Sequence, residues 1–435
     1  MDSRKDEPLR RDIGFFGSAF LSFNGMVGAG IFALPGTLND KFGAFSPFLF
    51  PLFGLLVLAV ALPFARVAAR HPVSGGPVVY AAAFGPVASF QAGWIYYVAR
   101  ATALAANTTV LVTYLAALWP VLAAPVPRAL IILAVTGLLT LVNVCGVKRA
   151  IRLLDAVTLL KAAPLLGMAI LGLMMFGGRL GPPGAVPPFT DLEAAALLIL
   201  YAFVGFENSV APAGETADPK RTIPRALIAT IVSTAALYFL VQLAYVAVMA
   251  PGAGGAAPMV GFGTALLGPA GGFILTATAV FSLLGNIGGG MTGTPRTSYA
   301  MARDGLLPAW FGRVGERYAT PANSIMFMGG LIALLALTGS FVWLAVVSTL
   351  ARMFVYSISI ASLAKGERPS PLLWIMMALA IAICIWAASQ SAWPSWRMLL
   401  ILAAAGTLLY AAARATARKD VVSSIQPPPS TRDPS

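Results

Sequence analysis

Histidine, cysteine and charged residues are scarce in this chain of 435 residues. It has one histidine and two cysteines, and only 10% of its residues are charged, whereas 58% are hydrophobic. Cys145 and Cys384 lie far apart in apolar segments, with no spacing typical of a metal site or a disulfide. We therefore expect both cysteines to be packing residues, and we expect no metal and no cofactor.

Groups that carry out enzymatic chemistry are missing from the apolar part of the sequence. The single histidine, His71, falls in a loop between apolar segments, and no acid/base dyad or cluster of His, Asp and Glu lies within those segments. The spacing Gly25-x-x-Gly28-x-Gly30 follows no predicted strand, so it lacks the context that a nucleotide-binding loop requires. These absences predict a protein that is not an enzyme.

Long apolar segments make up most of the chain. Its mean hydropathy is +0.83, and crossing a hydrocarbon core of about 30 Å takes about 20 mostly apolar residues per helix. This pattern predicts an all-α integral membrane protein in the lipid bilayer. Its twelve transmembrane helices are expected at residues 14–36, 45–67, 88–117, 127–146, 153–176, 191–213, 226–250, 271–295, 322–339, 341–363, 371–390 and 396–415.

Positive charge is distributed unevenly between the two sides of these predicted spans. Of the 29 Lys and Arg residues, three lie within spans, four in the loops of one side, and the remaining 22 in the termini and the alternate loops. This asymmetry is the positive-inside pattern, which places both termini, residues 1–12 and 416–435, in the cytoplasm. We expect a multi-pass protein of the plasma (inner) membrane with a disordered Ser/Pro-rich tail at 416–435. Its net charge of +13 reflects topology and predicts no binding of nucleic acid.

Three closely spaced glycines interrupt the first predicted span. Gly25, Gly28 and Gly30 lie where a membrane helix would be most regular, and each glycine weakens a helix interior by about 0.5–1 kcal/mol relative to alanine. At hydrocarbon depth, broken backbone is tolerated only where it faces protein or a water-filled cavity. The break therefore predicts a binding cavity at the membrane midplane, lined by free N–H and C=O groups, and hence a transporter.

A second interruption lies five spans later. Residues 201–208, Tyr-Ala-Phe-Val-Gly-Phe-Glu-Asn, place a glycine and two polar residues inside the sixth span. Paired breaks at corresponding positions of two five-helix halves indicate an inverted repeat. We predict a transporter core at 13–365, with repeats at 13–180 and 187–365, followed by two extra helices at 371–415. The Gly/Ala-rich stretch 252–272 is expected to be an external loop with a short interfacial helix.

Several local motifs, in order along the chain, carry a family resemblance. They are Gly-Ala-Gly-Ile-Phe-Ala-Leu-Pro at 28–35, Pro-Val-Ser-Gly-Gly-Pro-Val-Val-Tyr at 72–80, Gly-Phe-Glu at 205–207, Gly-Glu-Thr-Ala-Asp-Pro at 214–219 and Ala-Arg-Asp-Gly-Leu-Leu-Pro at 302–308. Through these motifs the chain resembles the bacterial amino acid permeases of the amino acid–polyamine–organocation (APC) superfamily. The resemblance implies a LeuT-type fold, in which helices 1–5 and 6–10 are related by a pseudo-two-fold axis.

The break in the first span suits the two charged groups of an α-amino acid. Residues 29–31 begin its second half, where free N–H groups and the helix dipole favour a carboxylate. The resemblance implies that the ammonium is bound by carbonyls of residue 26 and of residues 201, 202 and 204. An alternative role for the glycines is close helix packing. The expected substrate-binding residues of the two breaks are Met26, Gly28, Ala29, Gly30, Ile31, Tyr201, Ala202 and Val204.

Three positions near the break refine the expected substrate. Many relatives have serine where this chain has Ala29, so a hydroxyl contact to the carboxylate is absent. Asn286, in the glycine-rich run 285–291 of the eighth span, is a candidate substrate contact, or it bonds a neighbouring helix. Arginine–agmatine exchangers of the superfamily carry a tryptophan about where Gly290 stands, which argues against that substrate.

Two charged side chains within spans are candidates for coupling or gating. Lys161 resembles in position the lysine that occupies the second sodium site of sodium-coupled relatives, where a fixed ammonium removes the need for sodium and can exchange a proton. The alternative is snorkelling, since Lys161 lies about 12 Å into its span. For Glu207 we favour a coupling or gating role by reversible protonation over a structural role in holding the unwound sixth span. Phe206, beside it, is grouped with it.

Two arginines fall near the centres of spans 3 and 10, where an arginine costs about 2.5–3.5 kcal/mol on insertion scales. Arg100 lies one turn beyond Tyr97, and both are assigned to gating or coupling. Arg100 either faces the cavity and binds an acidic substrate side chain, or pairs with Glu207, or forms a buried structural pair. Arg352 is interpreted as structural.

These features predict a secondary active transporter of amino acids that works by alternating access, without sodium, and by proton coupling or exchange. A polyamine or other amine-metabolite exchanger of the same fold is the alternative, although a polyamine has no carboxylate and favours a more acidic site. A channel is less favoured, because the polar groups gather at one depth. The expected partners are the amino acid, protons and lipid, and the chain is expected to be a monomer or a homodimer.

Overall fold

The structure is a computed structural model that describes residues 12–71, 76–146, 149–210, 213–365 and 369–425, with side chains for all of these except 149–160 and 417–425. This part of the chain is helical apart from its loops and one isolated β-bridge between Ile13 and Thr216. Most of the N-terminal segment 1–12 and residues 72–75 of the loop motif lie outside the described residues.

Each predicted span corresponds to one helix or to a broken pair. Span 1 is divided between α1 (Phe15–Met26) and α2 (Ala29–Phe42), and span 6 between α8 (Phe189–Tyr201) and the short 3-10 helix η5 (Phe206–Ser209). The other spans are α3 (Leu49–Arg70), α5 (Pro86–Leu118), α6 (Pro125–Val144), α7 (Arg149–Phe176), α9 (Pro219–Val248), α10 (Pro258–Arg303), α11 (Ala322–Thr338), α12 (Phe341–Ala361), α13 (Pro371–Ser389) and α14 (Trp393–Ile425).

Length and composition mark ten segments of the described chain as able to cross a membrane. The predicted number of twelve differs for two reasons. The stretch Ala29–Arg70 counts as one segment although it holds the second half of span 1 and all of span 2, and α11, with 17 residues, is shorter than the length required. Both differences arise at elements that were predicted from hydropathy as separate spans.

Local sequence explains where several helices begin. Proline occupies the first position of α5, α6, α9, α10 and α13, where its missing N–H has no intrahelical role and its fixed φ suits a helix. The hydroxyl of Ser340 accepts a hydrogen bond from the backbone N–H of Trp343 (3.3 Å) and caps α12, and Ser370 does the same for α13 through Leu373 (3.3 Å).

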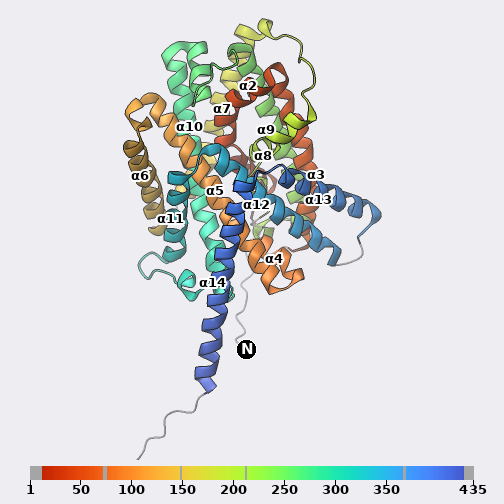
Figure 1. Ribbon diagram of the computed structural model, residues 1–435, viewed down its shortest axis with the longest axis vertical. Coiled ribbons are helices and arrows are strands. Elements are labelled where there is room, and N and C mark those ends of the chain that lie inside the picture. The colour runs from red at the N-terminus through yellow and green to blue at the C-terminus, as the bar shows by residue number, and fades with distance from the viewer. Residues whose placement is uncertain (1–11, 72–75, 147–148, 211–212, 366–368, 426–435) are drawn as a thin grey trace, which may run out of the picture.

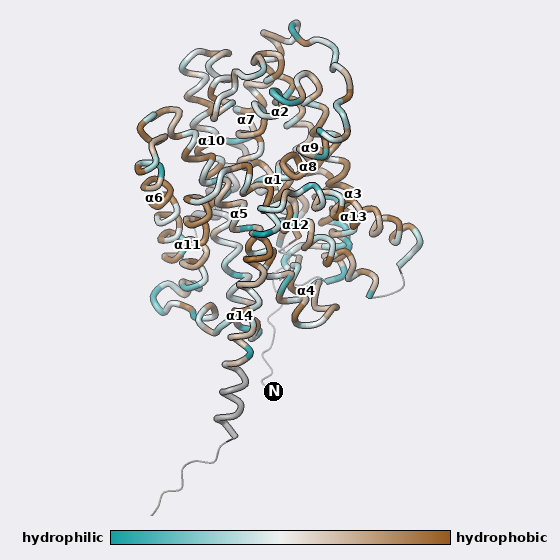
Figure 2. Tube along the Cα trace, viewed as in Figure 1, coloured by the Kyte–Doolittle hydropathy of each residue, from teal (hydrophilic) through white to brown (hydrophobic). Residues whose placement is uncertain are grey.

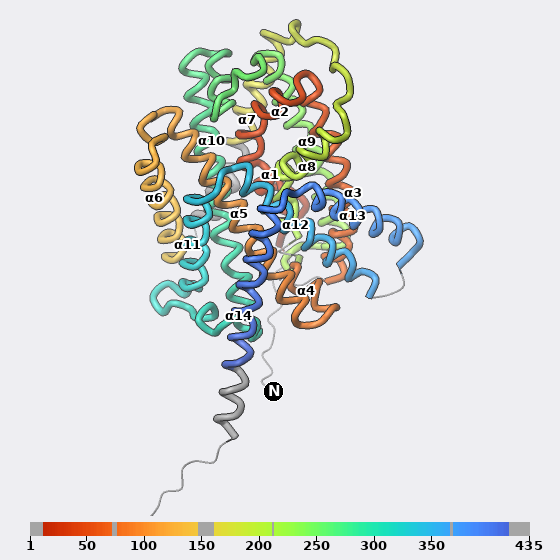
Figure 3. Tube along the Cα trace, viewed as in Figure 1, coloured from red at the N-terminus to blue at the C-terminus, as the bar shows by residue number. Residues whose placement is uncertain are grey.

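The helices of the two halves pack against their counterparts (Figure 1 and Figure 3). The second helices of the halves, α3 and α9, lie against each other, as do the third helices, α5 and α10. The first break, at the end of α1, packs against η5 of the second. Such contacts between equivalent elements are what an inverted repeat requires, because its elements meet around one axis.

The outer helices carry many hydrophobic residues, as lipid contact demands (Figure 2). Large hydrophobic side chains are exposed on outer helices, with Met174 of α7 at 80% and Leu408 of α14 at 72% exposure. The described chain begins and ends at the same end of the molecule, where α4 (Pro77–Ala81) also lies (Figure 1). An exposed apolar belt and ends on one side fit an even number of crossings.

Two segments refine the predicted boundaries. Leu267 and Gly268, with φ of +61° at the glycine, interrupt α10, so a short helix over 258–266 precedes the membrane span, as the Gly/Ala-rich composition predicts. Helix α14 continues to Ile425, ten residues beyond the predicted end at 415, and residues 426–435 of the expected tail lie outside the described residues.

Candidate functional site

The first break separates α1 from α2 by two residues. Val27 has φ −77° and ψ 81°, and Gly28 has φ −129° and ψ −145°, so neither continues the helix. The N–H groups in the first turn of a helix have no intrahelical carbonyl to bond. The break therefore presents the start of α2, at Ala29 and Gly30, to the interior of the protein.

The second break follows Tyr201. Residues 202–204 form tight turns in which the N–H of Val204 donates to the carbonyl of Tyr201 (3.1 Å), and Gly205 adopts a left-handed conformation with φ +115° before η5 begins. A residue with a side chain disfavours this conformation, which explains the need for glycine at position 205.

The two breaks lie face to face because glycines let their backbones approach. A Cβ atom on Gly205 would lie 2.4 Å from the carbonyl carbon of Gly25, and one on Gly30 would lie 2.9 Å from the Cα atom of Ala202. These glycines therefore allow close packing of the backbone, and this close packing brings the two breaks together.

Alanine at position 205 is expected to destabilise the protein by about 1–3 kcal/mol and to reduce uptake, because the added Cβ meets backbone and the left-handed conformation is strained. Gly167→Ala is the matched control, since nothing lies within 4 Å of the Cβ position of that membrane-helix glycine. Thermal unfolding in detergent measures the difference, and equal midpoints for the two variants would contradict the packing argument.

Two asparagines bridge the first break. The side-chain oxygen of Asn107 on α5 accepts a hydrogen bond from the N–H of Ala29 (2.8 Å), and its amide nitrogen donates to the side-chain oxygen of Asn286 on α10 (2.8 Å). The amide nitrogen of Asn286 in turn donates to the carbonyls of Asn24 and Gly25, each at 3.1 Å. This chain of amides joins the end of α1 to the start of α2 through two other helices.

Some of the backbone groups expected to bind substrate already have partners. The carbonyl of Met26 accepts hydrogen bonds from the N–H of Gly28 (2.9 Å) and the hydroxyl of Tyr238 (2.8 Å), and the N–H of Ala29 is held by Asn107. In this conformation the donors best placed for a carboxylate therefore begin at Gly30, unless Asn107 is displaced.

A narrow central cavity lies between the two breaks. Its volume of about 20 Å³ is room for about one water molecule, so the conformation is closed around the site. Its lining residues come from both breaks and from α5, α10 and α12: Gly25, Met26, Gly28, Ala29, Gly30, Arg100, Ala103, Leu104, Asn107, Tyr201, Val204, Gly205, Asn286 and Arg352.

The structure brings most of the predicted binding residues to this cavity. Ile31 and Ala202 are the exceptions: both are buried and neither lines the cavity. Ala202 packs against Gly30 instead. At Gly290, a Cβ atom would lie 2.5 Å from the side chain of Leu104, so leucine fills the space beside that glycine.

Lys161 fastens α7 to the first break. Its ammonium donates to the carbonyls of Asn24 (3.1 Å) and Val27 (3.2 Å) and to the side-chain oxygen of Asn24. The side chain is only 1% exposed, so it does not extend to the membrane interface as snorkelling requires. The ammonium satisfies carbonyls that the end of α1 leaves without helical partners.

Glu207 and Arg352 form a buried ion pair beside the second break. The Nε atom of Arg352 lies 2.9 Å from Oε1 of Glu207, and the two side chains are 0% and 2% exposed. The other carboxylate oxygen accepts hydrogen bonds from the N–H of Gly205 (2.9 Å) and the hydroxyl of Tyr356 (3.0 Å). Glu207 thus anchors the unwound segment to α12. The alternative in which Arg100 pairs with Glu207 is wrong, because the partner of Glu207 is Arg352.

Arg100 lines the central cavity and bonds only to neutral groups among the described residues. Its Nη1 atom donates to the side-chain oxygen of Asn208 (2.9 Å), and its Nε atom donates to Thr294 (3.4 Å). Tyr97, predicted as a gating residue on the same helix, lies elsewhere: it is fully buried, with its ring stacked on Trp94 at 5.7 Å between centroids. The two residues are one turn apart along α5, about 4.5 Å at 1.5 Å per residue, so they contact different parts of the protein.

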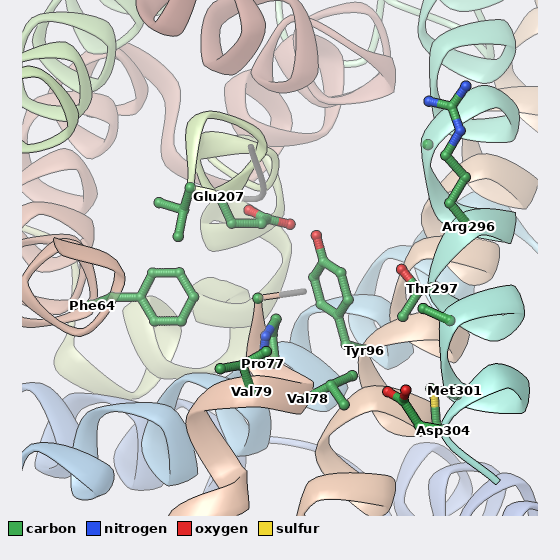
Figure 4. Close-up of a pocket in the computed structure, with 14 residues that line it drawn as sticks. Phe64, Pro77, Val78, Val79, Tyr96, Glu207, Arg296, Thr297, Met301 and Asp304 are labelled. Atoms are coloured by element: carbon green, nitrogen blue, oxygen red, sulfur yellow. The ribbon is translucent and has the colours of Figure 1, made fainter. Parts of the chain in front are cut away.

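A second cavity, of about 360 Å³, extends from the surface toward Glu207 (Figure 4). Figure 4 shows Tyr96, rather than Tyr97, beside the carboxylate of Glu207, with residues of α4 and the C-terminal part of α10 around them. Asp304 and Arg296 line its exposed part. We call this cavity the vestibule; it lies toward the end of the molecule at which the described chain begins and ends.

The ion pair separates the vestibule from the central cavity. Glu207 lines the vestibule, whereas Arg352 lines the central cavity. Phe206 lines neither: its ring packs on Phe64 and Tyr356, at 6.1 and 5.1 Å between centroids. The two members of the ion pair therefore face different cavities.

Three polar residues that hold the site were not among the predicted site residues. Asn107 and Asn24 bond groups at the first break, and Tyr238 bonds the carbonyl of Met26. The available signal was a polar side chain inside an apolar span, since such groups need partners within the protein. Asn107 lies near the middle of the third predicted span, where that signal is strongest.

Comparison with known proteins gives one family and one fold. Residues 13–413 match the family described as amino acid permease. An uncharacterized transporter of Mycobacterium tuberculosis is 31% identical over 350 residues, which cover 76% of this chain and 75% of that protein. The cadaverine/lysine antiporter of Escherichia coli K12 is 29% identical over 338 residues, which cover 75% of this chain and 74% of that protein.

A solved structure with a similar fold is that of MhsT in complex with L-phenylalanine. The TM-score is 0.59 over 91% of this chain and 99% of that chain, at 13% sequence identity. Similarity at this level of identity concerns the fold alone. It confirms the predicted LeuT-type architecture.

Proposed function

We propose, from the membership of this chain in the amino acid permease family of the APC superfamily, that it carries amino acids across the cytoplasmic membrane without sodium. The motifs of the sequence predicted this family. The proposed mechanism is alternating access, with the amino acid bound between the two breaks. Protons or a counter-transported substrate would supply the driving force. Both termini would lie in the cytoplasm, and the vestibule would then be the cytoplasmic route.

The observation that carries this proposal is the pair of facing breaks at one cavity. The start of α2 supplies N–H groups and a helix dipole for a carboxylate. Tyr201, Val204 and Gly205 of the second break line the same cavity, and half-helices of this kind are the usual binding elements of inverted-repeat carriers. An α-amino acid presents the carboxylate and the ammonium that these groups complement.

Sodium independence rests on Lys161. Its ammonium contacts two backbone carbonyls and one side-chain oxygen at the first break, and the hydroxyl of Ser282 donates to the carbonyl of Val27 (3.2 Å). Sodium binds such oxygen clusters in proteins as a hard cation. An ammonium that occupies the cluster leaves no requirement for the ion.

Exchange of an amine for an amino acid is the second candidate, because one relative is named a cadaverine/lysine antiporter. Proton-driven uptake and exchange share the site described above and differ in what accompanies the amino acid. They are distinguished by the contents of the vesicle rather than by the structure of the cavity.

Transport by the purified protein in proteoliposomes tests the proposal. We expect saturable uptake of a labelled amino acid that is unchanged when choline replaces sodium. Stimulation by an acidic exterior indicates proton coupling, whereas stimulation only after preloading with an amino acid or diamine indicates exchange. Uptake that requires sodium would contradict the assignment of Lys161, and flux that never saturates would favour a channel.

A further inference from the structure

The central cavity carries positive charge. Two arginines line it, whereas none of its described lining residues is Asp or Glu. Glu207 balances the charge of Arg352 from the vestibule side. Arg100 also lies within electrostatic reach of Glu207, but its hydrogen-bond acceptors among the described residues, Asn208 and Thr294, are neutral, so one carboxylate faces two guanidinium groups. The cavity therefore holds one cation in excess.

Arg352 also has a donor that the described protein does not use. Its Nε atom bonds Glu207, and its Nη1 atom donates to the carbonyls of Ala99 (3.0 Å) and Ser348 (3.3 Å). Its Nη2 atom is buried and has no hydrogen-bond partner among the described residues, although the side chain is 0% exposed. Buried donors are almost always paired, so this nitrogen needs an acceptor that the described protein does not supply.

Both arginines line the central cavity, so these two observations point to a negatively charged hydrogen-bond acceptor in that cavity. We infer that the amino acid carried by this protein has an anionic side chain, aspartate or glutamate, whose carboxylate binds between Arg100 and Arg352. This inference rests on the proposed function, because the α-carboxylate and the ammonium are assigned to the breaks. The planar guanidinium groups suit a carboxylate, with which arginine makes paired hydrogen bonds.

The same arrangement disfavours cationic substrates. A lysine-like side chain or a diamine would bring a second positive charge beside Arg100, in a cavity whose described lining offers no carboxylate. Like charges in a site of low dielectric repel strongly. A neutral side chain would leave Nη2 of Arg352 without a charged acceptor, so its binding is weaker than that of its acidic counterpart.

Competition in proteoliposomes tests this selectivity. Unlabelled aspartate, glutamate, asparagine, glutamine and lysine compete against labelled glutamate and, separately, labelled glutamine. We expect the acids to compete best and lysine least. In Arg100→Gln, loss of a charge-assisted contact should weaken the apparent affinity for the acids by about tenfold or more, and that for glutamine by much less. Arg313→Gln, at an exposed loop position, removes the same charge and should leave both affinities unchanged.

The outcomes separate this inference from the proposed function. Saturable uptake confined to neutral or cationic amino acids would overturn the inference and leave the proposed function intact. An unchanged ratio of glutamate to glutamine affinity in Arg100→Gln would overturn it as well. Absence of saturable uptake for every amino acid would overturn both. Should Arg100→Gln fail to fold, the ranking of competitors in the unmodified protein decides.

Discussion

Glu207→Ala is expected to destabilise the protein by about 3–5 kcal/mol, because it leaves the charge of Arg352 buried and unpaired. The N–H of Gly205 and the hydroxyl of Tyr356 lose their shared acceptor at the same time. With its anchor gone, the second break should lose its conformation, and uptake should fall to background. The unfolding midpoint in detergent and the initial rate of uptake measure the two effects.

Two further variants show whether the effect of Glu207→Ala is specific to that position and to its charge. Glu316→Ala removes an acid at an exposed position and should change neither stability nor uptake. Glu207→Gln keeps an oxygen that can accept from Gly205 but removes the charge, so an intermediate stability is expected. If Glu207 carries protons, the glutamine variant retains exchange and loses proton-driven accumulation; if it only anchors, both activities fall together. A midpoint for Glu207→Ala equal to that of the unmodified protein would contradict the anchoring role.

Removal of the Lys161 amine is the other change from which we expect a large effect. Lys161→Ala deletes the hydrogen bonds to Asn24 and Val27, and each charge-assisted bond contributes about 1.5–3 kcal/mol. The end of α1 should then separate from α7, and uptake should be lost. Lys220→Ala is the control, since that lysine is exposed at the start of α9.

Loss of uptake alone would not distinguish an anchor from a proton carrier at position 161. The pH profile of residual exchange in Lys161→Ala makes that distinction. An anchor predicts a lower rate with an unchanged profile, whereas a proton carrier predicts a profile that becomes flat. Uptake at the unmodified rate and with the unmodified profile would exclude both roles.

Hydropathy and charge were sufficient to predict the helices and their approximate order. Span 1 and span 6 were predicted as broken because their glycines and polar residues cannot be explained by lipid contact, and both breaks are present. Boundaries were predicted less well. Helix α14 extends to Ile425, since the sequence after 415 still favours helix locally and hydropathy does not report where a helix ends outside the membrane.

Contacts within the site could be predicted only where a residue type demanded them. A buried arginine and a buried glutamate had to find partners, but the sequence did not indicate that Arg352 rather than Arg100 pairs with Glu207. The pairing depends on how α5 and α12 are rotated toward η5. The same rotation directs Tyr96 to the vestibule and Tyr97 to the packed interior.

The hydrogen bond between Asn107 and the N–H of Ala29 affects the expected affinity for an amino acid. In this conformation an amide oxygen already accepts from a backbone N–H that the carboxylate of an amino acid would need, so a bound amino acid would have to displace Asn107 from that N–H. The free energy gained on binding is then the difference between two similar hydrogen bonds rather than that of one complete hydrogen bond. On the proposed function, we therefore expect modest affinity for the amino acid and rapid release of it.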